Sequence, residues 1–114
     1  MKALLLKWDL KELPGDIFEK LRRYIAQESW PRYANKKGLV QKVWFSNPEI
    51  GDFGGFYLWE TEEDMEEEIL TMHRIKAMTG KDPSIRRWDI EAIQQGTHSV
   101  KDLKSVGLAW EKSD

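Results

Sequence analysis

The chain has 114 residues and a mass of 13.4 kDa, a size typical of a single domain. It contains no cysteine, which excludes disulfides, thiolate nucleophiles, zinc-thiolate sites and iron–sulfur clusters. The 18 basic and 20 acidic residues give a formal net charge of −2, so the composition does not indicate a basic surface that would bind nucleic acid or an anionic membrane. No apolar run approaches the roughly 20 residues of a membrane span, and no secretory signal is evident. We therefore expect a cytoplasmic protein with no nucleic-acid and no membrane partner.

The first third of the chain predicts a strand followed by a helix. Residues 3–9 form an apolar run that alternates from Lys7 and stops at a Pro-Gly turn within residues 10–15. From Asp16 the apolar residues recur at steps of three and four, which is the period of an amphipathic helix. We expect this helix to end near Trp30, because the residue before Pro31 is disfavoured in the α conformation.

The middle of the chain predicts a hairpin of two strands, residues 39–45 and 54–60, joined by a polar loop. A register with Trp44 opposite Gly55 divides the side chains between two apolar faces. One face would carry Val43, Phe45, Phe56 and Leu58, and the other Val40, Trp44, Tyr57 and Trp59.

A second helix is expected from Thr61 to Gly80, with Met65, Ile69, Met72 and His73 on the stripe that faces the sheet. Seven of the nine residues in the span 60–68 are acidic, which we interpret as a solvated helix face favoured by the helix dipole. Residues 84–90 then supply a fourth strand.

The resulting order β-α-β-β-α-β predicts an α+β fold, a ferredoxin-like antiparallel sheet with two helices on one face. We assign residues 1–92 to this domain and residues 93–114 to a C-terminal arm that packs on the domain or on a partner subunit. The helices can cover only one face of the sheet, so the apolar residues of the other face need a partner. A second copy of the chain in a C2 homodimer is the simplest one.

Two sets of residues are candidates for chemistry. His73 could act as a base beneath the sheet, or it could bond a backbone carbonyl and have no chemical role. Trp44, Tyr57 and Trp59 could line a pocket for an aromatic substrate, or they could pack in a dimer interface. No phosphate loop, nucleophile elbow or dinucleotide fingerprint is present. His73 and His98 alone make no metal-binding motif, so we expect no metal.

The chain resembles the YdhR-like putative monooxygenase family of the dimeric α+β barrel superfamily. The resemblance is carried by residues 41–44 (Gln-Lys-Val-Trp), residues 54–59 (Gly-Gly-Phe-Tyr-Leu-Trp), the helix that holds His73, and residues 88–90 (Trp-Asp-Ile). It implies a homodimer with a ligand cavity between sheet and helices. It also implies a cofactor-independent monooxygenase, needing no metal or flavin, that oxidises a small aromatic or polycyclic compound.

In that interpretation His73 is the catalytic base, and Trp44, Tyr57 and Trp59 are the substrate-binding walls. Two alternatives remain open on the same fold, a non-catalytic small-molecule-binding protein and an isomerase. Haem-degrading members of the superfamily use an asparagine on the first strand, whereas residues 1–9 contain none, which argues against a haem site.

Overall fold

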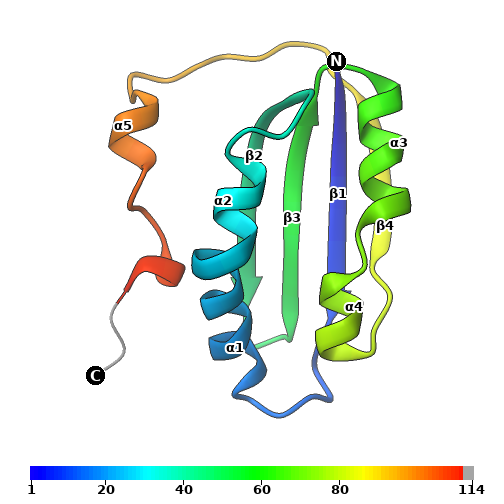
Figure 1. The fold of residues 1–114 in the computed structure, drawn as a ribbon, viewed down its shortest axis with the longest axis vertical. Helices are drawn as coiled ribbons and strands as arrows, with labels where there is room; N and C mark the ends of the chain where they lie inside the picture. The colour runs from blue at the N-terminus through cyan, green and yellow to red at the C-terminus, as the bar shows by residue number, and fades with distance from the viewer. Residues whose placement is uncertain (112–114) are drawn as a thin grey trace.

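The computed structural model describes residues 1–111 and shows one four-stranded sheet with its helices on a single face (Figure 1). The strands are β1 (Lys2–Asp9), β2 (Leu39–Asn47), β3 (Asp52–Trp59) and β4 (Ser84–Asp89), in the spatial order β2-β3-β1-β4. Every neighbouring pair is antiparallel. The predicted ferredoxin-like α+β fold is confirmed.

Two helical segments cover the sheet. The first consists of α1 (Ile17–Tyr24), a π-helical turn η1 (Ile25–Ser29) and α2 (Trp30–Tyr33), and it lies over β2 and β3. The second consists of α3 (Glu62–Thr71) and α4 (Arg74–Thr79), and it lies over β1 and β4. The core between the layers is built from apolar side chains of β1, β3, α1 and α3, among them Leu4, Leu6, Leu21, Trp59 and Met65.

The hairpin adopts the expected register, with Trp44 opposite Gly55. A bulge between Leu39 and Gln41 was not expected, and it places Leu39 opposite Trp59. Val40, predicted to belong to the apolar face of Trp44, is instead 43% exposed.

The second helical segment differs from the single helix expected from Thr61 to Gly80. Met72 is extended and His73 leaves the helical region, so the chain turns between α3 and α4. The Thr71 hydroxyl donates to the Glu67 carbonyl at 2.8 Å, an arrangement that bends helices. His73 is exposed as a result, although the sequence pattern placed it on the stripe that faces the sheet.

Beyond β4 a long connection carries the chain to α5 (Val100–Leu103) and a 3₁₀ turn, η2 (Leu108–Trp110), on the side of α1 (Figure 1). Ser99 and Asp102 form a capping box at the start of α5. The Trp110 ring meets Trp30 edge-on with ring centroids 5.1 Å apart. Within residues 1–111 no helix is long and apolar enough to cross a membrane.

A glycine in β3 tests this packing. A Cβ atom at Gly54 would lie 2.3 Å from the Leu6 carbonyl oxygen and 2.6 Å from the Phe45 ring. Overpacking of this kind costs roughly 1–3 kcal/mol, so Gly54→Ala should lower the free energy of unfolding by about that amount in urea titrations. Gly96→Ala is the matched control, because no heavy atom would lie within 4 Å of its Cβ. Equal stability of the two variants would contradict the register.

Candidate functional site

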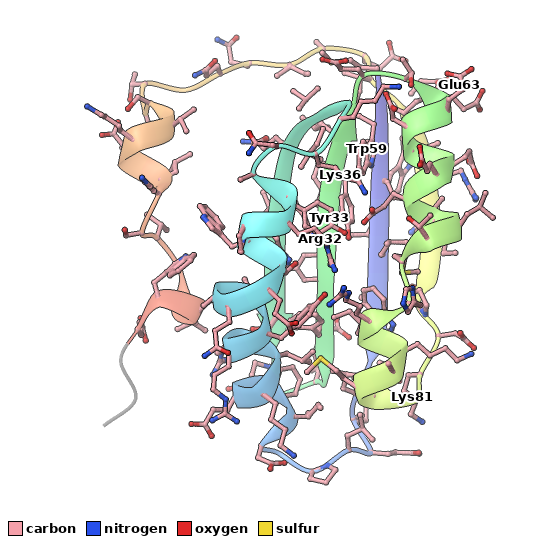
Figure 2. The ribbon with its side chains drawn as sticks, in the orientation of Figure 1. Arg32, Tyr33, Lys36, Trp59, Glu63 and Lys81 are labelled. Atoms are coloured by element: carbon pink, nitrogen blue, oxygen red, sulfur yellow. The ribbon has the colours of Figure 1, made fainter. Side chains whose placement is uncertain are left out.

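The site begins with the π-helical turn between α1 and α2. The Trp30 N–H donates to the Ile25 carbonyl, five residues back, so the helix widens just before Pro31. Proline has no N–H to donate, and the widened turn lets the helix accommodate it. The helix therefore does not end near Trp30, as the sequence predicted, but adds a turn that carries Arg32 and Tyr33. Figure 2 shows both side chains projecting from α2 across the face of β3.

Tyr33 and Glu68 connect the two helical segments. The Tyr33 hydroxyl donates a hydrogen bond to the Glu68 carboxylate of α3, and both side chains are buried. Burial, with the negative charge of Glu68 next to it, raises the pKa of Tyr33 well above its ordinary value, so the phenol stays protonated. A buried carboxylate is costly unless hydrogen-bonded, and Tyr33 provides that bond.

Lys42 lies among three aromatic rings beneath this bridge. Its Nζ atom is 3.5 Å from the ring centroid of Tyr33, 4.4 Å from that of Trp44 and 4.5 Å from that of Tyr57. Such contacts stabilise a cation through the negative faces of the rings. The side chain comes from β2, where Lys42 pairs with Tyr57 and lies two residues before Trp44, so all three point to the same side of the sheet.

Burial lowers the pKa of Lys42 to about 7. The charge of Glu68 opposes this shift, whereas the positive charges of Arg32 and Lys36 add to it. Lys42 is thus divided between ammonium and free amine near neutral pH. Lysines with this property are found where proteins bind anions or use an amine in chemistry.

These residues surround a cavity of about 230 Å³ between the sheet and the helices. Its aromatic walls are Trp8, Tyr24, Tyr33, Trp44, Phe53 and Tyr57. The charged residues that line it are Arg32, Lys36, Lys42, Glu68 and Arg74, and His73 also lines it. An aromatic lining with a few polar groups at one place is typical of a small-molecule site.

Three of the four residues predicted for the site lie on this cavity, namely Trp44, Tyr57 and His73. Trp59 is fully buried and stacks on Tyr57, with ring centroids 5.8 Å apart and planes inclined by 15°. Trp59 therefore packs against the ring of Tyr57 without lining the cavity itself. The exposed His73 lies between α3 and α4, with Nδ1 2.7 Å from the Thr71 carbonyl oxygen.

Lys42, Tyr33 and Glu68 were missed by the sequence analysis. Strand alternation contained the signal for Lys42, which lies two residues before Trp44. Helix spacing contained the signal for Glu68, which follows Met65 by three residues on the buried stripe, whereas the acidic run was interpreted as solvated throughout. Tyr33 had no signal, because the expected helix ended before it.

Arg87 of β4 donates two hydrogen bonds to the Glu66 carboxylate of α3, at 2.6 and 3.2 Å. Arg86 points away from this pair and lies over the Trp88 ring at 5.3 Å. Among residues 1–111 there is no group of three or more histidine or carboxylate side chains that could hold a metal ion.

The fold and the cavity define the class, a ferredoxin-like α+β protein with a cavity between its sheet and its helices. The family model described as "Putative mono-oxygenase ydhR" matches residues 11–99, most of the chain, and the chain belongs to that family. No curated protein sequence matches it.

Solved structures share the fold at low sequence identity. A protein of unknown function from Nitrosomonas europaea has a TM-score of 0.64 at 14% identity, covering 85% of this chain and 95% of its own. The ActVA-Orf6 monooxygenase of Streptomyces coelicolor, solved with nanaomycin D, has a TM-score of 0.61 at 8% identity, covering 84% and 92%. SnoaB, a cofactor-independent oxygenase from Streptomyces nogalater, has a TM-score of 0.50 at 10% identity, covering 85% and 97%.

The lowered pKa of Lys42 predicts a pH-dependent effect on stability. The unfolded chain holds the Lys42 proton up to its ordinary pKa of 10.5, whereas the folded chain releases it near 7. Between these values the unfolded state binds more protons, so the penalty for burying Lys42 is full below pH 7 and disappears as the pH rises. Lys42→Met should therefore raise the free energy of unfolding more at pH 6 than at pH 9.5.

Urea titrations at the two pH values measure this difference. Lys104→Met, which removes an exposed lysine next to α5, controls for the change in net charge. A gain from Lys42→Met that is the same at both pH values would contradict the shifted pKa.

Proposed function

We propose that this protein is a cofactor-independent monooxygenase that oxidises a small aromatic compound in the cavity between sheet and helices. The observation that carries the proposal is the cavity itself, whose aromatic walls surround a partly buried cation, Lys42. Family membership supports the reaction type. The fold is shared with a monooxygenase that binds nanaomycin D and with a cofactor-independent oxygenase, which supports the ligand class and the absence of a cofactor.

The chemistry requires a substrate with an acidic C–H group next to an aromatic ring. A base removes the proton, and the carbanion transfers electrons to O₂ and forms a carbon–oxygen bond. The hydroperoxide that results loses water, so one oxygen atom remains as a carbonyl and the other leaves as water. Four electrons pass from the methylene carbon to O₂, and the balance closes without another reductant.

His73 is the proposed base. A backbone carbonyl can only accept a hydrogen bond, so its contact with Thr71 assigns the proton of the neutral imidazole to Nδ1. Nε2 then keeps its lone pair, and the residue lines the cavity. Trp44 and Tyr57 are the proposed walls, and Trp59 fixes the plane of Tyr57 by stacking on it. A bound aromatic substrate would displace water from the cavity, and this would strengthen each electrostatic contact with the carbanion.

Oxygen uptake tests the reaction. Anthrone and a panel of aromatic quinols should consume O₂ in the presence of the purified protein without added flavin or metal. A positioned base contributes a factor of roughly 10²–10⁴, so His73→Ala should lower kcat at least about a hundredfold. His98→Ala, in the exposed arm, is the matched control and should leave the rate unchanged.

Unchanged turnover in His73→Ala would remove this residue from the role of base. Tight binding of the panel without any oxygen uptake would contradict the monooxygenase and identify a binding protein or an isomerase.

We also propose that the protein acts as a homodimer through the face of the sheet that the helices leave open. Val43 and Trp88 on that face are 48% and 41% exposed, and Leu5, Phe45 and Phe56 extend the apolar surface between them. Exposed apolar patches of this kind mark interaction surfaces. A C2 contact would bury the same patch on both copies.

Light scattering coupled to gel filtration should therefore give twice the mass of one chain. Val43→Asp introduces a charge into the apolar surface of the open face, on the edge strand β2, and should yield the single-chain mass without unfolding the protein. Ile50→Asp, at an equally exposed position in the β2–β3 loop, should remain dimeric. A wild-type protein of single-chain mass would contradict the dimer.

A further inference from the structure

The Lys42 ammonium has aromatic faces around it but no directed partner. Among residues 1–111 its Nζ takes part in no hydrogen bond or ion pair, and its contacts are the rings of Tyr33, Trp44 and Tyr57. We propose that the cavity is an anion site that selects a flat aromatic compound bearing a negatively charged oxygen, with Lys42 as the specificity-determining residue. The inference rests on the proposed function for the role of the cavity and adds the class of substrate.

The charges of the cavity favour an anion. Four cationic side chains line it, from Arg32, Lys36, Lys42 and Arg74, whereas Glu68 is the single carboxylate among the described lining residues. Glu68 already accepts the hydrogen bond of Tyr33. Arg74 is within 3.5 Å of Glu28, outside the cavity lining. The electrostatic potential inside the cavity is therefore positive near Lys42, and a bound anion would offset this positive charge.

The aromatic rings determine the shape of the ligand. Ring faces stabilise the ammonium on several sides but accept no strong hydrogen bond from its three N–H groups. A ligand oxygen next to Nζ would supply the missing acceptor, and the ring attached to it would lie between Trp44 and Tyr57. The volume of about 230 Å³ restricts the ligand to a small ring system.

Binding of such an anion should be coupled to proton uptake. The titratable and charged groups facing Lys42 are Arg32 and Tyr33 of α2, Lys36 after it, Tyr57 of β3, Glu68 of α3, His73 between α3 and α4, and Arg74 of α4. An anion next to Nζ adds a negative charge to this set and favours the ammonium form. Because the free amine is present above pH 7, the affinity for a permanent anion should fall as the pH rises.

This selectivity is useful to the proposed reaction. The substrate must lose a proton before it can reduce O₂, and the negative charge then spreads from carbon onto an oxygen conjugated with the ring. A cation fixed next to that oxygen would stabilise the anion more than the neutral substrate. Lys42 would thus favour deprotonation by another group without itself accepting the proton.

Two naphthalene derivatives of matched size test the inference. Naphthalene-2-sulfonate is anionic at every pH used, and naphthalene-2-carboxamide is neutral. Calorimetric titration of the wild-type protein at pH 6 should give a Kd for the sulfonate at least about tenfold lower than for the amide. That Kd should rise about tenfold between pH 6 and pH 8, with proton uptake detected as a heat that depends on the buffer, while the Kd of the amide stays constant.

Variants identify the residue responsible. Lys42→Met should bind both compounds equally at both pH values, and Lys42→Arg should keep the preference for the sulfonate but lose its pH dependence, since arginine stays charged. His73→Ala should retain both the preference and the pH dependence. Equal affinity of the wild-type protein for the two compounds would overturn the inference, as would a preference that survives in Lys42→Met or a pH dependence that disappears in His73→Ala.

The experiment needs no turnover, so its failure is distinct from failure of the proposed function. Anion selectivity in a protein that consumes no oxygen would support the anion site and contradict the proposed oxidation. Oxygen uptake by a protein without the selectivity would support the oxidation and contradict the role of Lys42 as the specificity-determining residue.

Discussion

The hydrogen bond between Tyr33 and Glu68 is the constraint on which the site depends. It joins the first helical segment to the second above the middle of the sheet, and both partners are buried. Removing one partner of such a pair leaves a buried polar group unpaired, which is costly. The bond therefore fixes where the two helical segments stand relative to each other, and the cavity is the space left beneath it.

The position of Tyr33 follows from the π-helical turn that precedes it. The helix continues through Pro31 after the widened turn, and Tyr33 at the end of α2 bonds Glu68. The same turn brings the Tyr33 ring to within 3.5 Å of the Lys42 ammonium. π-helical turns are frequent at functional sites, and here the turn assembles three elements, α2, α3 and β2, around one lysine.

Hydrophobic periodicity was sufficient to predict the element order, the antiparallel sheet and the pairing of Trp44 with Gly55, because burial of one face dictates these features. It could not predict the π-helical turn or the break at Met72 and His73, since both depend on hydrogen bonds that compete locally within a helix. The aromatic part of the site could therefore be predicted, and its polar part could not. Strand and helix spacing place Lys42 and Glu68 on apolar faces, but a charged residue there is expected to be solvated unless its buried partner is known. That partner is Tyr33, which lies beyond the end of the expected helix.

The central claim is that the fold encloses a lysine in an aromatic cavity and lowers its pKa. The most direct measurement is an NMR titration of the Lys42 side chain with ¹³C at the ε-carbon, assigned by comparison with Lys42→Arg. The account predicts a midpoint at a pH of about 7. A midpoint at the ordinary lysine value of 10.5 would contradict it.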